Sequence, residues 1–546
     1  MRRALALVSF SALTACGGSG SHALPATSSA MPPVTPGAPA TSARFTIIVP
    51  PKSATAANAR TPKYISSSTQ SIVITLETVN GTAFTGSPAS TATNLTTSNP
   101  ACSSSSGTLT CTASAPAIPG ADSYSVVTYD AQQSSSSPAS PAGNILSEAT
   151  LPITIVANQV NMPATPLVLN GVPASIAVTS TDPHVLGTQA AGYSLVGNRP
   201  YTITLAALDA DNNTIIGPGA PTFTVTSGSS AITVSPASAN TATVQVKSFS
   251  ATPVMLTVTP SLGSAINVAF ATVQEIWVSD LGTDSVTGYA AGTNVAISAD
   301  TLGTSVNVTD PQGIAFDKSG NLWVSNGSNI TEYAAGNLAQ ITANTINATG
   351  TANSPISDAV GLAFDTSGNL WVANLSSNSV TEFAAGTNTQ ITANTISTNG
   401  QFPLAEPSDV AFDAAGNILV TSDFDSAVSE YVPGTSTPIT GDTITAGIDG
   451  PFSLAFDKSA NLWVVNTAAS TVTEYAAGTH TQVTSNTITA GLNVPRAVAF
   501  DANGNLWVTN QDVATVTEYA AGTNTQITAN TITAGLSSPF GLAITP

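Results

Sequence analysis

Six polar residues recur at one position of a repeated segment, and their side chains could bind a ligand. Each lies two residues after a hydrophobic triplet such as Leu322-Trp323-Val324. They are Asp280, Asn326, Asn374, Ser422, Asn466 and Asn510, and Asp284, Asp423 and Asp425 add carboxylates in the two copies that depart most from the repeat. Oxygen ligands of this kind suit calcium rather than zinc. We therefore expect a polar ring that binds a ligand or a cation, with solvated turn residues as the alternative interpretation.

The same region is poor in residues for catalysis. From residue 274 onward the only histidine is His480, in a Thr-His-Thr turn where other copies carry Asn388 and Asn524, and there is no cysteine. We expect this histidine to lie exposed on the rim. Neither a nucleophile motif nor a glycine-rich phosphate loop occurs. A non-catalytic binding role is therefore favoured, with no cofactor other than the candidate calcium ion.

Short strands must position these residues. The segment 313–326 returns with small changes as 361–374, 454–466 and 497–510. The Phe of each Phe-Asp pair lies at 316, 364, 412, 456 and 500, so the period is 48 and then 44 residues. This spacing is typical of propeller blades, and six hydrophobic triplets predict six blades of four strands each. The Asp of each Phe-Asp pair is predicted to form a hairpin turn. The Trp of five triplets is predicted to fill the core, with Leu419 in its place in the fourth.

The chain ends with a lone first strand, from Phe540 to Ile544, whereas the first blade begins at its second strand. We expect the C-terminal strand to complete the first blade, because ring closure removes open strand edges. The alternative uses Val268 to Phe270, which precede Trp277 by the same spacing that separates Phe316 from Trp323.

The pattern Gly-Ile-Ala-Phe-Asp-x-x-Gly-Asn-Leu-Trp-Val resembles NHL repeats and the propeller of streptogramin lyase-like proteins, over residues 274–546. The resemblance implies a six-bladed β-propeller. NHL propellers serve mostly as binding platforms, while some relatives are enzymes. A streptogramin lyase-like or lactonase-like metal-dependent enzyme is therefore one alternative function, and a structural spacer without a specific ligand is another.

Two β-sandwich modules are predicted upstream, over residues 44–170 and 171–273. Both stretches contain short alternating strands separated by turn signals such as Asn80-Gly81. The segment from Pro119 to Tyr124 resembles the corner before a late strand of immunoglobulin-like domains. In an exported chain, the nearby Cys102 and Cys111 predict a local disulfide. The predicted fold class is all-β: two immunoglobulin-like sandwiches, then a six-bladed propeller closed by the C-terminal strand.

The first sixteen residues have the pattern of a processing signal. Arg2 and Arg3 precede an apolar run, which ends in Leu13-Thr-Ala-Cys16. This resembles the lipobox of bacterial lipoproteins, which implies lipidation of Cys16 and attachment to a membrane; an ordinary secretory signal is the alternative. Residues 17–43 are predicted to form a Ser-, Pro-, Gly- and Ala-rich spacer. Gly17 after the cysteine favours the outer membrane or cell surface, and we expect an exported, anchored monomer.

Charge is concentrated in the C-terminal half. From residue 274 onward, 23 Asp and Glu residues face only Lys318, Lys458 and Arg496, a net charge of −20. Such a surface repels phosphate backbones, so we expect no nucleic-acid partner. We expect a cationic ligand or a basic protein partner that approaches the first and fourth blades.

Overall fold

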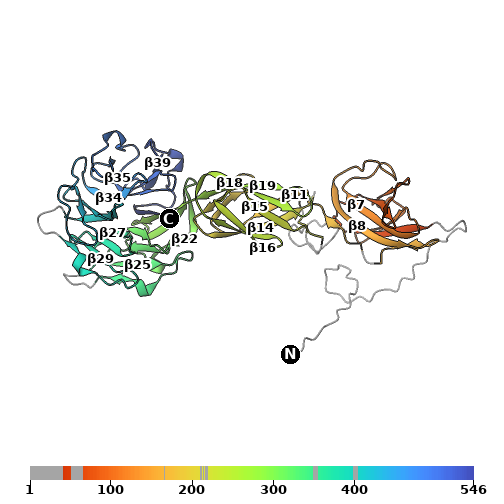
Figure 1. Ribbon diagram of the computed structural model, residues 1–546, viewed down its shortest axis with the longest axis horizontal. Coiled ribbons are helices and arrows are strands. Elements are labelled where there is room, and N and C mark those ends of the chain that lie inside the picture. Colours follow the sequence, from red (N-terminus) through yellow and green to blue (C-terminus); the bar gives the residue numbers. More distant parts are fainter. Residues whose placement is uncertain are drawn as a thin grey trace, which may run out of the picture.

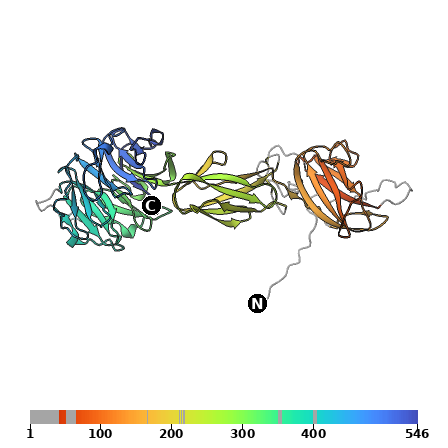
Figure 2. The same ribbon diagram turned by 45° about the horizontal axis from the view of Figure 1, so that its top comes forward.

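The computed structural model describes residues 41–50, 65–164, 167–209, 212, 214–215, 219–348, 355–397 and 404–545. Cys16, the rest of the predicted signal and most of the predicted spacer lie outside these residues. Apart from five short 3-10 turns, every regular element described is a β-strand. The strands form three bodies in a row (Figures 1 and 2). In the described part of the chain, no helix has the length and apolar character needed to cross a membrane.

The first body consists of two sheets. One has the order β5 (Cys102–Ser105), β6 (Thr108–Ala115), β1 (Ser42–Val49) and β9 (Val160–Asn161). The other has the order β10 (Asn170–Gly171), β8 (Ile145–Ile155), β7 (Gly120–Tyr129), β2 (Ser71–Val79) and β3 (Thr82–Ala83). In the second sheet, β4 (Ser90–Asn94) also pairs with β2. Strand β1 alternates between buried and exposed residues, because only one face of its sheet covers the core. Phe45 and Tyr124 meet edge to face there, with ring centroids 5.6 Å apart. A disulfide joins Cys102 to Cys111 across β5 and β6.

The second body also consists of two sheets, which share one core. One has the order β11 (Ser175–Thr179), β14 (Pro200–Leu208), β17 (Thr241–Val246) and β16 (Ile232–Ser238), and the other has the order β12 (Val185–Thr188), β13 (Gly192–Val196), β19 (Ile266–Val273), β18 (Ser250–Pro260) and β15 (Phe223–Ser227). Tyr201, Leu256 and Phe270 are buried between them. The sheets therefore pack face to face, as the alternating pattern of the sequence requires.

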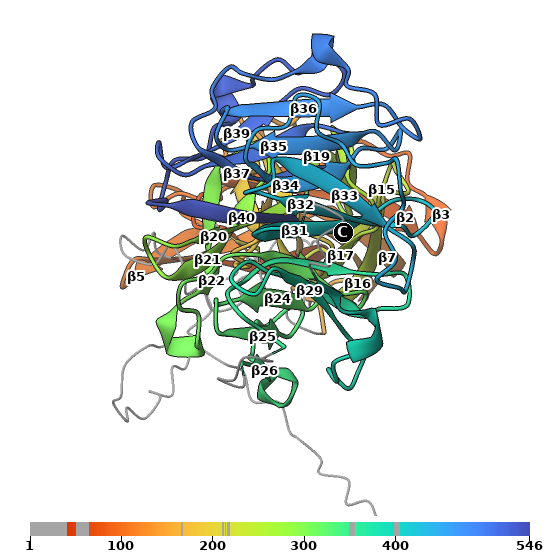
Figure 3. The ribbon, with the colours of Figure 1, turned by 90° about the vertical axis from the view of Figure 1, so that its left-hand side faces the viewer.

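The third body contains six small antiparallel sheets. The first sheet contains β20 (Glu275–Asp280), β21 (Ser285–Ala290), β22 (Val295–Leu302) and β40 (Pro539–Ile544). The second contains β23 (Ile314–Phe316), β24 (Leu322–Ser325), β25 (Asn329–Tyr333) and β26 (Ile346–Asn347), and the third contains β27 (Ala359–Phe364), β28 (Leu370–Asn374), β29 (Ser379–Phe383) and β30 (Ile396–Ser397). The last three have three strands each: β31 (Pro407–Phe412), β32 (Ile418–Ser422) and β33 (Ala427–Tyr431) in the fourth; β34 (Pro451–Phe456), β35 (Leu462–Asn466) and β36 (Thr471–Tyr475) in the fifth; and β37 (Pro495–Phe500), β38 (Leu506–Asn510) and β39 (Thr515–Tyr519) in the sixth. The inner strands β40, β23, β27, β31, β34 and β37 contact one another in cyclic order. In Figure 3, β34, β35 and β36 follow one another outward from the centre.

The prediction of four strands in every repeat is wrong for three sheets. In the fourth, fifth and sixth sheets the outermost strand is reduced to two isolated bridges, such as Val472 to Ile488 and Tyr475 to Gln482 in the fifth. The second strands, in contrast, are buried along their whole length, as in β28 and β35. Neighbouring sheets cover both faces of these strands, and Trp323 of the second sheet packs against Leu362 and Leu370 of the third. The core therefore lies between the sheets.

The C-terminal strand closes the ring. Strand β40 pairs antiparallel with β20, with Trp277 opposite Ala543 and Ile276 opposite Ile544. It also contacts the inner strands of the second and sixth sheets. The alternative inner strand, Val268 to Phe270, belongs to β19 and pairs with β18 in the second body. The first sheet is therefore completed by the end of the chain, as predicted.

A cluster of buried charges joins the second body to the ring. Arg199 Nη2 lies 2.9 Å from Glu275 Oε2 and 3.7 Å from Asp300 Oδ2, and His184 Nε2 lies 2.5 Å from Asp300 Oδ2. Beside them Val196 packs against Ala290 of the first sheet. Burial, followed by contact with Asp300, raises the pKa of Glu275 to about 9. Arg199, which lies closer to Glu275 than to Asp300, opposes this rise.

Deletion of residues 539–545 should destabilise the ring far more than the loss of a frayed end, because it exposes the edge of β20 and removes buried Phe540 and Leu542. The smaller change Leu542→Ala should cost about 2–5 kcal/mol. Val513→Ala, at an exposed position of the sixth sheet, is the matched control. Thermal and denaturant unfolding measure the effect, and an unchanged stability after deletion would contradict closure by β40.

The contact between the second body and the ring should become less stable as the pH rises. Glu275 holds its proton up to about pH 9 in the folded chain, whereas its ordinary pKa is 4.5, so its contribution to stability falls between these values by at most about 1.4 kcal/mol per pH unit. Glu275→Gln imitates the protonated carboxyl and should flatten this dependence. Melting curves between pH 6 and 9 test it, with Asp442→Asn on the exposed rim as the control. Equal slopes for the wild type and Glu275→Gln would refute the assignment.

Candidate functional site

The polar residues at the ends of the second strands do not form a ligand-binding ring. Asn374 is fully buried, and its amide nitrogen donates to Val372 O and Thr381 Oγ1 at 3.3 and 3.0 Å. Its side-chain oxygen accepts the Ser357 N–H, from the loop that precedes the inner strand of the same sheet. Each amide thus ties one loop to its own sheet.

The equivalent residues of other sheets behave in the same way. Asn326, Asn466 and Asn510 are buried, and each accepts a backbone N–H from the residue 17 positions earlier. Ser422 is also buried. The expectation of a polar ring around a ligand is therefore wrong, because these groups are used inside the sheets.

The carboxylates predicted to bind calcium are occupied as well. Asp280 accepts N–H groups from Thr283, Ser537 and Ser538 at 2.7–3.2 Å, and this holds the loop that leads into β40. The others fix loops elsewhere: Asp284 Oδ1 accepts Asp310 N–H and Asp425 Oδ2 accepts Ala405 N–H. Asp423 is partly buried near Arg496, and burial raises its pKa. Within the described residues, no three His, Cys, Asp or Glu side chains gather as a metal site would require.

His480 is also placed differently from the prediction. Its side chain is largely buried, with 19% of its surface exposed, and its Nδ1 lies 3.6 Å from Glu430 Oε2 of the neighbouring fourth sheet. It takes the position of Asn388 and Asn524, which reach across to the preceding sheet and donate to a backbone carbonyl. His480 therefore bridges two sheets on the outside of the ring.

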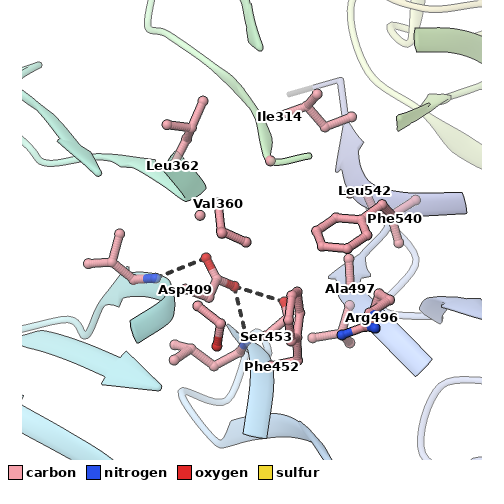
Figure 4. A pocket seen from close by; sticks show the side chains of 17 residues that line it. Ile314, Val360, Leu362, Asp409, Phe452, Ser453, Arg496, Ala497, Phe540 and Leu542 are labelled. Carbon is pink, nitrogen blue, oxygen red and sulfur yellow. Dashed lines mark hydrogen bonds between the residues drawn. The ribbon is translucent and has the colours of Figure 1, made fainter. Parts of the chain in front are cut away.

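The inner strands surround a cavity of about 150 Å³ (Figure 4). Its shape follows from one position of the repeat, the first residue of the Gly-Ile-Ala-Phe-Asp segment. On three inner strands this residue is glycine, and neighbouring backbones approach too closely for a side chain. A Cβ atom at Gly313 would lie 1.9 Å from Val360 O, and one at Gly541 would lie 2.1 Å from Gln312 O. This half of the ring is therefore tightly closed.

In the other half, the same position carries side chains. Asp409, Ser453 and Ala497 occupy it on β31, β34 and β37, and all three line the cavity. Half of the remaining lining residues are aliphatic: Ile314, Val360, Leu362, Val410, Leu454, Val498 and Leu542. The repeat is therefore broken where the polar groups face the channel.

Asp409 is the most polar group of the cavity wall. Its Oδ2 accepts hydrogen bonds from Ser453 Oγ at 2.8 Å and Leu454 N at 3.1 Å, and its Oδ1 accepts one from Val410 N at 2.9 Å (Figure 4). Enclosure by the inner strands raises the pKa of Asp409 to about 6, while these donors oppose the rise. None of the ion pairs found among the described residues includes Asp409. A carboxylate without a cation therefore faces a small cavity.

Two aromatic rings and one arginine cover the cavity. The rings of Phe452 and Phe540 meet edge to face at 5.1 Å, and the Arg496 guanidinium lies 4.5 and 5.3 Å from their centroids. Arg496 Nε donates to Gln511 Oε1 at 2.6 Å, and Gln511 Nε2 donates to Ser538 Oγ at 2.9 Å. This hydrogen-bond network runs from the sixth sheet to the first. Arg496 therefore both covers the cavity and links the two sheets between which the ring closes.

This site was not predicted from the sequence, although two features of the sequence indicate it. Asp409 stands where three other copies carry glycine, and Arg496 is the only arginine after residue 274. Neither feature was used, because the functional prediction was based on the residues that recur in every repeat.

Comparison with known proteins gives a limited result. No family model matches the chain, and no curated protein matches its sequence. A streptogramin B lyase structure is similar with a TM-score of 0.37 and 10% identity, over 49% of this chain and 82% of that one. Virginiamycin B lyase from Staphylococcus aureus is similar with a TM-score of 0.35 and 11% identity, over 58% of this chain and 92% of that one. A protein from Bacteroides fragilis that carries the name 6-phosphogluconolactonase is similar with a TM-score of 0.38 and 14% identity, over 50% of this chain and 98% of that one. These values are too low to transfer an activity.

Asp280→Asn should destabilise the ring rather than abolish an ion site. An amide oxygen can replace only part of the carboxylate that accepts three backbone N–H groups, and charge-assisted hydrogen bonds contribute about 1.5–3 kcal/mol. Melting curves with and without millimolar calcium measure both effects. A calcium-dependent rise in the melting temperature of the wild type that is absent from the variant would restore the metal interpretation.

Proposed function

We propose that this protein is an exported lipoprotein anchored through Cys16, which presents a six-bladed, NHL-like β-propeller (274–546) as a non-catalytic binding module. Residues 17–43 act as a spacer, and residues 44–170 and 171–273 act as two immunoglobulin-like sandwich modules. The propeller binds its ligand in the central channel. The three bodies in a row support a role in display at a distance from the membrane (Figure 2).

The break of repeat symmetry around the cavity carries this proposal. Asp409 and Ser453 stand where three other sheets carry glycine, and they line one space together with Arg496. A purely structural spacer gives no reason for a partly buried carboxylate at this position, because partial burial of a charge without a cation is unfavourable. Polar groups that converge on one cavity are typical of small-molecule sites.

A catalytic role has less support. The cavity wall contains neither His nor Cys, and it offers a single carboxylate. General acid and base catalysis needs two groups with different proton affinities near the reacting atoms. Arg496 is already engaged by Gln511 and by two aromatic rings. The arrangement therefore suits recognition better than turnover.

The anchor is tested by Cys16→Ser in the full chain. Lipidation requires the cysteine thiol, so the variant should leave the membrane fraction while wild type and the control Thr14→Ser remain in it. Fractionation followed by immunodetection measures this. Unchanged membrane association of Cys16→Ser would remove the anchoring part of the proposal.

The channel is tested with four small probes: n-butylammonium, n-butanol, butyrate and γ-butyrolactone. At least one should raise the melting temperature of the full chain in detergent, and Asp409→Gly, which restores the glycine of other repeats, should abolish the shift. Asp442→Asn should keep it. No shift with any probe, or equal shifts in Asp409→Gly, would count against a channel site. Hydrolysis of γ-butyrolactone that depends on Asp409 would overturn the non-catalytic assignment.

A further inference from the structure

We propose that the channel cavity binds a small organic cation, a primary alkylammonium whose N–H groups donate to Asp409. This inference rests on the proposed function, since it names the ligand class of the same site. It differs from the sequence-based expectation of calcium, because recognition depends on a single carboxylate that accepts hydrogen bonds from an ammonium group.

The charge of Asp409 is the first argument. A carboxylate enclosed by protein is stable when it is paired with a cation, hydrogen-bonded or protonated. Only neutral donors reach it here: the Ser453 hydroxyl and the backbone N–H groups of Val410 and Leu454. Its pKa of about 6 leaves it ionised at neutral pH. A cation in the cavity would therefore meet a negative charge that no described side chain neutralises.

The remaining hydrogen-bonding capacity is the second argument. An ionised carboxylate offers about four lone-pair sites. The described contacts use two sites on Oδ2 and one on Oδ1. Ser408 Oγ, the other hydroxyl in the wall, already donates to Pro451 O at 3.1 Å. One acceptor site on Asp409 Oδ1 is thus left for an ammonium N–H.

The size and chemistry of the cavity are the third argument. A volume of about 150 Å³ equals that of an engineered apolar cavity that holds benzene. Ile314, Leu362, Leu454 and Leu542 lie at the edge of the cavity, and only the small exposed parts of their side chains can contact a short carbon chain. A ligand of about five non-hydrogen atoms with one charged end fits these dimensions.

The surroundings disfavour an anion or a metal ion. Arg496 could attract a carboxylate, but Asp423 and Asp512 lie near its guanidinium, and its Nε is bonded to Gln511. Calcium requires six to eight oxygen ligands, whereas the cavity wall offers one carboxylate. The net charge of −20 over residues 274–546 also favours the approach of cations.

Calorimetry on the full chain in detergent tests the ligand class, with n-butylammonium as the probe and n-butanol as the neutral analogue. The wild type should bind n-butylammonium and bind n-butanol more weakly. Asp409→Asn and Asp409→Gly should each bind n-butylammonium about thirtyfold more weakly or worse, because they remove one partner of a buried charge pair. Asp442→Asn removes the same charge from the exposed rim of the fourth sheet and should bind like the wild type.

The pH dependence separates recognition from a merely structural role. Alkylammonium ions stay charged up to about pH 10. The affinity should therefore be constant above pH 7 and fall about tenfold per pH unit below the pKa of Asp409, near pH 6. Ser453→Ala removes a donor to the carboxylate and should move this midpoint to higher pH. A structural role of Asp409 predicts no such displacement.

Each outcome is decisive. Absent binding of n-butylammonium to the wild type, equal binding to Asp409→Gly, or an affinity independent of pH between 5 and 8 overturns the inference. If n-butanol or butyrate instead stabilises the chain in an Asp409-dependent way, the ammonium inference fails while the proposed binding function stands. If none of these probes acts, both fail. Unfolding curves of both Asp409 variants establish that they are folded.

Discussion

The pairing of β40 with β20 is the interaction on which the C-terminal half depends. It joins the last described residues to the first sheet of the ring, more than 250 positions earlier in the chain. The same strand brings Phe540 and Leu542 to the cavity wall. Ring closure and formation of the cavity are therefore a single structural event. Asp280 supports it by holding the loop before β40, and Arg496 supports it through Gln511 and Ser538.

A repeated polar network makes the individual sheets uniform. Asp317 Oδ1 accepts the N–H groups of Ser319 and Asn321, and Asn321 Nδ2 donates to Glu332 Oε1 at 2.7 Å. The prediction that these Asp residues form turns is thus confirmed. The first sheet lacks the network: Glu275 stands where Asn321 stands in the second, and Gly288 faces Trp277 where Glu332 faces Trp323. A Cβ at Gly288 would lie 2.3 Å from Glu275 Oε1, so the two changes depend on each other. This altered sheet is the one that binds the second body.

Hydroxyl groups of the second strands link neighbouring inner strands. Ser279 accepts Gly541 N–H and donates to Gln312 O, and Ser325 does the same with Gly313 N–H and Val360 O. In the fourth sheet Thr421 instead bonds to Ser408, which reaches Pro451 O. The indirect link occurs beside Asp409. In the sixth sheet Thr509 repeats the direct link, because it accepts Ala497 N–H and donates to Phe540 O.

The sequence by itself determined the repeat, the order of the strands, the hairpin turns and the closing role of the C-terminal strand. It could do so because these features depend on local patterns and on the cost of an unpaired strand edge. Only the tertiary structure decided where the polar side chains point. Asn374 and Asp280 face loops that become their neighbours after the sheets form, so their spacing resembled a ligand ring although their amide and carboxylate groups are satisfied. Asp409 and Arg496 acquire their significance from the inner strands that surround them, because enclosure and the absence of a nearby cation are properties of packing rather than of order along the chain.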